Sequence, residues 1–311
     1  MEKQSPKTPW LTIILVLVVL SIFSVIIAGG IGMFLGMGGS ETPGTGNVAI
    51  IPIEGPIVTT PSTGLGQRES VSDDVIGLIE KAQKDVSIKA IVFSINSPGG
   101  SPVASDEIAT AIRQTNANKT TVALIRDLGA SGAFWIATAT NHVVANPASF
   151  TGSIGVIGSY LEFGNFLDDH NVTYRRLTAG KYKDMGSPFK TMTAEEQQLF
   201  QQSLDELHTL FINAVAENRK LSPETVRTLA TGQFYTGIQA KKYGLVDDLG
   251  GIQEVRAYLK QQLKTDVKFV SFKKPKGLFE RLASSFSNLG FSVGQGIGAS
   301  LKEEPNTKMM V

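Results

Sequence analysis

Two short segments of the chain carry residues that could cut a covalent bond. Residues 129–135 (GASGAFW) place Ser131 between small residues, ahead of an apolar stretch. Residues 180–184 (GKYKD) offer Lys183 farther along the chain. Because the chain has no cysteine, a serine activated by a lysine is the best nucleophile that the sequence offers.

Ser131 has two interpretations. A serine at the start of a helix is ordinarily an N-cap. As a nucleophile, Ser131 would lie beside Gly129 and Gly132, which allow close backbone approach, and the helix N-terminus would stabilise an oxyanion. Residues 97–101 (SPGGS) could supply a second donor, because they follow an expected strand at the end where ligands bind in such sheets. Their alternative role is a tight Pro-Gly turn.

The general base is the harder question. Lys183 could be an ordinary surface lysine; as a base, it needs a pKa about 2–3 units below the usual value of about 10.4. Burial beside a hydroxyl, which Ser153 could supply, would lower the pKa by penalising the ammonium form. Of the three histidines, His142 opens an expected strand, His170 lies in a polar turn and His208 lies on an expected long helix. None of these places suits catalysis better than that of Lys183.

An uncharged segment near the start predicts a membrane anchor. Residues 10–37 are apolar and glycine-containing, and about 20 apolar residues are enough to cross a bilayer. The alternative is a cleaved signal peptide, but the apolar run is long for one and lacks an A-x-A-like site. Lys3 and Lys7 precede it and Glu41 is the first charge after it. This charge bias predicts a single-pass protein of the cell membrane with residues 1–9 in the cytoplasm and the remainder outside.

Beyond a flexible linker at residues 38–47, strands and helices alternate, which predicts an α/β domain over residues 48–270.

Residues 271–311 form a basic and then amphipathic tail, either poorly ordered or lying on a membrane surface. A formal net charge of +1, spread along the chain, gives no reason to expect a nucleic-acid partner. We expect strands at 48–53, 89–95, 121–126, 142–145 and 172–177, helices at 72–84, 102–115, 131–140 and 193–220, and turns at 128–130 and 151–155.

Taken together, the motifs are more specific than any one of them. Their order resembles the signal peptide peptidase A family of membrane-anchored Ser-Lys peptidases, and the resemblance covers roughly residues 48–270. The motifs are SPGGS (97–101), ASG (130–132), TGSIGV (151–156), GKYKD (180–184), MTAEE (192–196), GQFYTG (232–237) and AKKYGLVD (240–247).

The resemblance implies a role for each candidate residue. Ser131 corresponds to the nucleophile, Lys183 to the general base and Ser153 to the serine that orients the lysine. The amides of Gly100 and Gly132 correspond to the oxyanion hole, and neither a metal nor a cofactor is implied. Two features depart from the family pattern: Ala133 stands where many members have a second glycine, and Lys181 offers an alternative base two residues from Lys183.

The fold implied is that of the Clp protease and the crotonases, with stacked β-β-α units, preceded here by one transmembrane helix. The function implied is a serine endopeptidase that cleaves apolar peptides, such as signal-peptide remnants in the membrane, through an acyl-enzyme. Two alternatives remain open: a crotonase-like acyl-CoA hydratase or isomerase, and a catalytically silent membrane scaffold.

The resemblance also predicts an assembly. Longer relatives carry two such domains in tandem, with the lysine in one and the serine in the other. A chain with a single copy resembles one half, so Ser131 of one subunit would meet Lys183 of its neighbour. Only a closed, head-to-tail ring completes every site in this way, so we expect a ring-shaped homo-oligomer.

Overall fold

The computed structural model describes residues 10, 14–24, 46–62 and 68–273, and contacts divide the chain into two units, residues 1–44 and 45–311. In the first unit, residues 14–24 form a helix whose side chains are all exposed. Within the described ranges, no helix is both long enough and apolar enough to cross a membrane. Most of the expected span at 10–37, most of the linker and nearly all of the tail lie outside these ranges.

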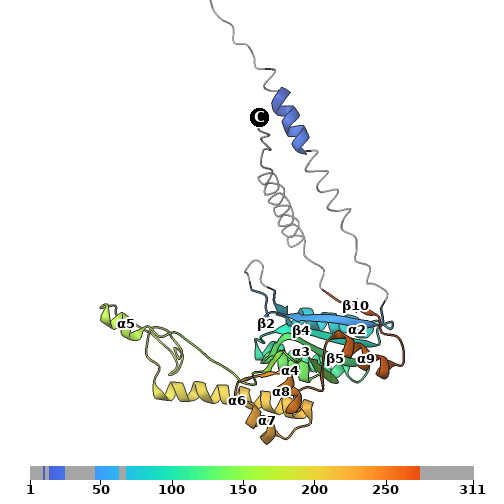
Figure 1. The fold of residues 1–311 in the computed structure, drawn as a ribbon. Coiled ribbons are helices and arrows are strands. Elements are labelled where there is room, and N and C mark those ends of the chain that lie inside the picture. Colours follow the sequence, from blue (N-terminus) through green and yellow to red (C-terminus); the bar gives the residue numbers. More distant parts are fainter. Residues whose placement is uncertain (1–9, 11–13, 25–45, 63–67, 274–311) are drawn as a thin grey trace, which may run out of the picture. The chain divides into compact units, whose positions relative to one another are not determined.

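The second unit is built on a largely parallel eight-stranded sheet (Figure 1). The main strands lie in the order β10-β1-β4-β5-β6-β9, and each pairs in parallel with its neighbours. The predicted α/β class is therefore confirmed. The bounds are β1 (Val48–Glu54), β4 (Ala90–Ser97), β5 (Thr120–Ala130), β6 (His142–Ala145), β9 (Asp248–Leu249) and β10 (Phe269–Ser271).

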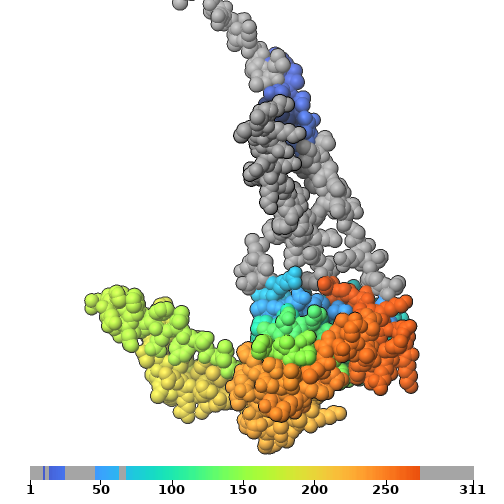
Figure 2. Space-filling model, viewed as in Figure 1, coloured from blue at the N-terminus to red at the C-terminus, as the bar shows by residue number. Residues whose placement is uncertain are grey.

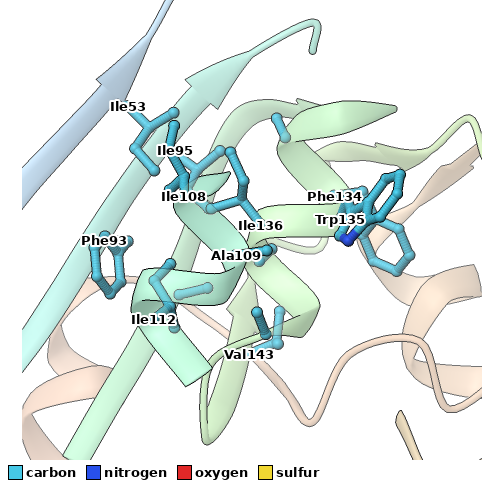
Figure 3. Packing of buried hydrophobic residues seen from close by; sticks show 14 of the residues in the cluster. Ile53, Phe93, Ile95, Ile108, Ala109, Ile112, Phe134, Trp135, Ile136 and Val143 are labelled. Carbon is cyan, nitrogen blue, oxygen red and sulfur yellow. The ribbon is translucent and has the colours of Figure 1, made fainter. Parts of the chain in front are cut away.

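Both faces of this sheet carry apolar side chains that pack against helices. The strands are therefore almost continuously hydrophobic. On one face, strand residues such as Ile53, Phe93 and Ile95 pack with Ile108 and Ile112 of a helix (Figure 3). The alternate strand residues form a second apolar cluster with another helix on the opposite face. The first face is covered by α2 (Ser72–Lys84), α3 (Pro102–Thr115) and α4 (Gly132–Thr138), the second by α9 (Ile252–Leu263).

Beyond Ile125, strand β5 shifts its register with β4 and gains β7 as a further neighbour within the same sheet. Its last residues pair in parallel with β7 (Phe150–Gly152), and β7 pairs antiparallel with β8 (Phe234–Thr236). A separate two-stranded sheet joins β2 (Ile57–Val58) to β3 (Ser70–Val71). The pairing of β5 with β7 places the end of β5, with Ser131, beside β7.

Residues 157–193, which we call the arm, project from the domain with the first turns of the long helix α6 (Ala194–Arg219) (Figure 1). The arm contains α5 (Gly164–Asp169), and it stands clear of the body in the space-filling view (Figure 2). The other end of α6 packs in the core, where Phe211 stacks on Trp135 of α4 at 4.9 Å. The helices α7 (Pro223–Leu229) and α8 (Gly237–Lys242) follow.

Four expectations about elements are wrong. The turn expected at 151–155 starts only after Gly152, because residues 151 and 152 pair with β5 and β8 as the end of β7. Residues 128–130 are not a turn, because they pair with β7 as the end of β5. The helix expected from residue 131 begins at Gly132, since the backbone of Ser131 is not helical. Residues 172–177 are not a strand: they are exposed and pair with no described strand, so their β-forming residues have no ladder to join.

Candidate active site

Ser131 occupies a sharp turn between β5 and α4. Its φ of 53° and ψ of −126° lie in a region that non-glycine residues rarely adopt, at a cost of about 1–3 kcal/mol. The surrounding chain holds this conformation: the Ser131 N–H donates to the Gly152 carbonyl at 2.8 Å. The Ser131 side chain makes no capping hydrogen bond, so the N-cap interpretation fails. A strained strand-to-helix turn is one way in which a fold can expose a serine hydroxyl for nucleophilic attack.

The loop at residues 97–101 lies directly against this serine. Gly99 has a φ of 97°, and a Cβ added to it would lie 2.9 Å from the Ser131 Cβ and 2.7 Å from the Gly132 nitrogen. A Cβ added to Gly132 would lie 2.2 Å from the Ser105 Oγ. Both positions therefore have no room for a Cβ; close approach was predicted from the sequence at Gly132 but not at Gly99.

Two backbone amides converge at this point. The Gly99 carbonyl accepts from Ile57 and the Ser101 N–H donates to Ile57, which fixes the loop between them. The amides of Gly100 and Gly132 have no acceptor among the residues that the structure describes. The Gly100 nitrogen lies 3.4 Å from the position that a Cβ on Gly132 would occupy. Two unpaired backbone donors near a candidate nucleophile are the kind of group that stabilises an oxyanion.

Ser153 lies beside Ser131 because the strands that precede them are paired. Ala130 and Gly152 are register partners in β5 and β7, and each is followed by a serine with positive φ, which is 49° at Ser153. The Ser153 N–H donates to the Gln233 carbonyl at 2.9 Å. The structure thus brings together Ser131, Ser153, Gly100 and Gly132.

Lys183 is not part of this cluster within one chain. It lies in the arm, its side chain is exposed, and its backbone N–H donates to the Gly180 carbonyl. Its Nζ makes no hydrogen bond or ion pair with any described residue. Figure 1 shows the arm extending away from the sheet that carries Ser131.

Lys181, the alternative base, is held in its charged form. Its Nζ contacts both carboxylate oxygens of Glu195, at 2.8 and 2.7 Å, and the Tyr182 hydroxyl bonds the same carboxylate. The hydrogen bond to Glu195 raises the pKa of Lys181 well above its ordinary value. A lysine that keeps its proton is a poor general base, which counts against Lys181 in this arrangement.

The histidines have other surroundings. His142 lies 2.9 Å from Asp248 and stacks on Tyr258. It pairs with Val122, near the end of β5 that is remote from Ser131. His170 contacts the Phe166 carbonyl at 2.8 Å in the arm, and His208 lies on α6.

Several hydroxyl groups that support the site were not among the predicted residues. Ser97 Oγ accepts the Gly99 N–H at 3.1 Å, and Thr151 Oγ1 donates to the Gly129 carbonyl at 2.6 Å. Ser105 Oγ donates to the Ser101 carbonyl at 2.8 Å. Ser97 and Ser101 belong to a predicted motif, but the sequence carries no sign that Ser105 packs on Gly132, because that contact depends on how α3 and α4 cross.

Comparisons with known proteins agree with this geometry. A family model described as Peptidase family S49 matches residues 113–266. A Methanocaldococcus jannaschii protein named as a protease is 34% identical over 73% of this chain and 72% of its own length. A protein of Enterococcus faecium, named as a signal peptide peptidase SppA, is 30% identical over 81% and 74%. Protease 4 of Salmonella typhi is 35% identical over 68% of this chain and 34% of its own length.

Proposed function

The chain belongs to peptidase family S49 and is a serine peptidase of the SppA kind, and from this premise we propose that Ser131 is its nucleophile and Lys183 its general base. The observation that carries the proposal is the strained turn at Ser131 beside two unpaired amides. The unpaired side chain of Lys183 and the ion-paired one of Lys181 support the choice of base.

The chemistry follows from these positions. Neutral Lys183 takes the proton of the Ser131 hydroxyl as Oγ attacks the scissile carbonyl carbon. The negative oxygen that forms accepts hydrogen bonds from the Gly100 and Gly132 amides. The protonated lysine then gives its proton to the leaving amine, which breaks the C–N bond and leaves an acyl-enzyme. Lys183 next accepts a proton from water as the water oxygen attacks the acyl carbon, and it returns that proton to Ser131 Oγ as the C–O bond of the acyl-enzyme breaks. Ser153 orients the lysine throughout.

A second copy of the chain completes the site in this proposal. The arm exposes an unusual number of large apolar side chains, and among them Ile157 is 92% exposed and Leu177 fully so. Exposed apolar surfaces of this kind mark protein interfaces. Docking the arm on a neighbour would bury them and bring Lys183 to that neighbour's Ser131. Because every arm must find a partner, the contacts run head to tail and close into a ring.

We also propose a membrane anchor and apolar peptide substrates. The described helix at residues 14–24 exposes apolar side chains on all its faces, which suits a lipid environment rather than water. With the flanking charges, the anchor would leave the N-terminus in the cytoplasm and the catalytic domain outside. Signal-peptide remnants are then the substrates at hand, and the name of the E. faecium relative points the same way.

The finer fold proposed is that of the Clp protease and the crotonases. The parallel sheet, the loop amides and the side branch in which β7 pairs with β5 and β8 support it. No feature of the described residues favours the acyl-CoA hydratase or the silent scaffold over the peptidase.

Mixing two inactive variants tests the shared site. Ser131→Ala and Lys183→Ala proteins, co-assembled, should regain part of the wild-type rate on an apolar peptide, because some interfaces then pair an intact serine with an intact lysine. As a control, Ser131→Ala is mixed with the double variant Ser131→Ala/Lys183→Ala, which should stay inactive. If mixed assemblies verified by two affinity tags remain inactive, the dyad does not form between subunits.

A fluorophosphonate probe tests the nucleophile independently. It should label the wild-type protein at one serine, and labelling should disappear in Ser131→Ala but persist in Ser203→Ala, a change of an exposed serine on α6. Labelling that survives in Ser131→Ala would show that another serine is the nucleophile.

A further inference from the structure

Four charged side chains of alternating sign lie in series around the loop that carries Lys183. They are Arg176, Asp184, Lys190 and Glu196, and we call them the arm network. Asp184 pairs with Arg176 and, at 3.3 Å, with Lys190. Lys190 in turn contacts Glu196 at 2.6 Å. The network therefore runs from the residue next to Lys183 to the first turn of α6.

The inner members of the arm network are shielded from water although they belong to a projecting segment. The side chains of Asp184 and Lys190 are 9% and 17% exposed, and that of Glu196, at the α6 end, is 5% exposed. Charged side chains are seldom buried to this degree unless they are paired. Each charge here has an opposite partner within ion-pair distance, which is the condition under which proteins tolerate shielded charges.

Glu196 joins the network to the backbone of α6. Its Oε2 accepts the Thr193 N–H at 2.9 Å, and Thr193 Oγ1 accepts the Glu196 N–H, which together make the capping box of the helix. At the other end, backbone bonds from Lys183 to Gly180 and from Ser187 to Asp184 fold the loop into successive turns. Fixing Asp184 thus fixes the backbone of Lys183 relative to the start of α6.

We propose that the arm network is a positioning device for the catalytic base, which holds the Lys183 backbone at a set place relative to α6. The proposal rests on the role of Lys183 proposed above. A base delivered from a neighbouring subunit must arrive within hydrogen-bond reach of the serine, and a displacement of about 1 Å can reduce the rate about 10²-fold. Because α6 also packs on α4 through Phe211 and Trp135, the network links the loop to the rigid part of its own subunit.

The network stays charged over the pH range in which the base would titrate. The hydrogen bond from Arg176 lowers the pKa of Asp184, and that from Lys190 lowers the pKa of Glu196. The bond to Glu196 raises the pKa of Lys190, and the bond to Asp184 raises that of Arg176. A change in the pH profile of a network variant therefore reports the surroundings of Lys183 and not titration of the network itself.

The chain offers a matched control in the Lys181–Glu195 pair. It joins the same loop to the same turn of α6, at 2.7 Å, but its side chains are 67% and 55% exposed. An exposed pair of this kind contributes little to a defined geometry. Glu195→Gln therefore removes one charge beside the arm network and leaves the four side chains of the network and their ion pairs in place.

The test is a double-mutant cycle on the full-length protein, read as the rate at which a fluorophosphonate labels Ser131. Asp184→Asn and Glu196→Gln should each slow labelling about 10- to 100-fold, and Glu195→Gln should leave it within about two-fold. In a Lys183→Ala background, Asp184→Asn should have no further effect, because there is no base left to position. Lys190→Arg, which keeps the charge, should retain more of the rate than Lys190→Met.

The outcomes separate this proposal from the one on which it rests. If Lys183→Ala labels as fast as the wild type, the assignment of the base is wrong. If Lys183→Ala is slow but Asp184→Asn and Glu196→Gln match the Glu195→Gln control, the positioning role is wrong. An equal slowing by Asp184→Asn with and without Lys183 would also overturn it, since a general loss of structure would act in both backgrounds.

Discussion

At the scale of residues, the site is made of backbone as much as of side chains. The Ser131 conformation, the two glycines at the loop and the unpaired amides are held by contacts with hydroxyl groups and carbonyls. Gly132 leaves no room for a side chain, because a Cβ added to it would meet the buried Ser105 Oγ. Small additions of volume should therefore affect catalysis before they affect the fold.

Gly132→Ala should lower kcat/KM by about 10²-fold or more, the usual effect of losing one oxyanion donor. The added methyl would lie 2.2 Å from Ser105 Oγ, so the Gly132 amide must move away from the Gly100 amide. The control is Gly77→Ala on α2, where no atom lies within 4 Å of the added carbon. Peptide hydrolysis by both variants, with thermal unfolding to confirm folding, gives the comparison. Activity of Gly132→Ala equal to that of the control would show that the Gly132 amide is not a donor.

Lys183→Ala should lose activity by several orders of magnitude, while Lys181→Ala should keep most of it. The general base must be neutral, so kcat/KM of the wild type should rise with pH through an apparent pKa well below the lysine value of about 10.4. The pH profile of Lys181→Ala should keep the same shape. Retained activity in Lys183→Ala together with its loss in Lys181→Ala would reverse the assignment.

The candidate residues could be predicted from the sequence more readily than their geometry. Ser131, Ser153 and the glycines stand in recognisable motifs, and the structure brings these four positions together. The positive φ of Ser131 could not be predicted, because it depends on the Gly152 carbonyl and therefore on the pairing of β5 with β7. The position of Lys183 in space could not be predicted from the neighbouring residues either, because it depends on how the arm projects from the domain.

At the scale of elements, α6 connects the arm to the core, and its far end is tied down by charge. Arg219, in the last turn, makes two hydrogen bonds to Asp247, at 2.8 and 2.7 Å. Asp247 also accepts the Val143 N–H at the start of β6. Burial raises the pKa of Asp247, but the hydrogen bonds and charge of Arg219 outweigh it, so that the pKa falls below its ordinary value.

Asp247→Asn should therefore reduce the free energy of unfolding at neutral pH by up to about 3 kcal/mol, since it leaves the buried Arg219 without its counter-charge. The folded-state pKa of Asp247 is depressed, so its contribution is complete above the ordinary value of about 3.9 and is lost as the pH falls through the lower folded value. The difference between wild type and variant in urea unfolding should shrink correspondingly in acid.

Asp248→Asn is the control for this pair, because Asp248 is 53% exposed and pairs with His142 and Lys241 near the surface. Its effect should stay below about 1 kcal/mol. Equal destabilisation by the two variants would show that the Arg219–Asp247 pair does not anchor α6.

Helices could be predicted where the apolar residues follow the helical period, and strands where a short apolar run marks a buried strand. The helices α2, α3 and α6 lie close to their expected bounds, and α3 begins at the expected cap, where Ser101 accepts the Ala104 N–H. Residues 128–130 were misassigned because Gly129 suggests a turn, whereas pairing with β7 makes them a strand. The segment at 172–177 has strand-forming residues, but no described strand pairs with it.

At the scale of the whole molecule, the proposed anchor can be tested without any knowledge of substrate. The full-length protein should remain with membranes after carbonate washing, because an apolar segment such as residues 10–37 would be embedded in lipid. Protease added outside intact cells should reach the domain that carries Ser131. Recovery of a soluble form that starts near residue 38 would show that the apolar segment is a cleaved signal instead.

The separation of Ser131 from Lys183 also sets when the enzyme can act. If each serine receives its base from a neighbour, a single chain leaving the ribosome is latent without needing a pro-segment. Assembly then follows mass action, so the rate per subunit should climb steeply with protein concentration and fall on dilution. A peptidase kept silent in this way cannot cut nearby membrane proteins while it is scarce, and the amount of protein in the membrane becomes the signal that turns it on.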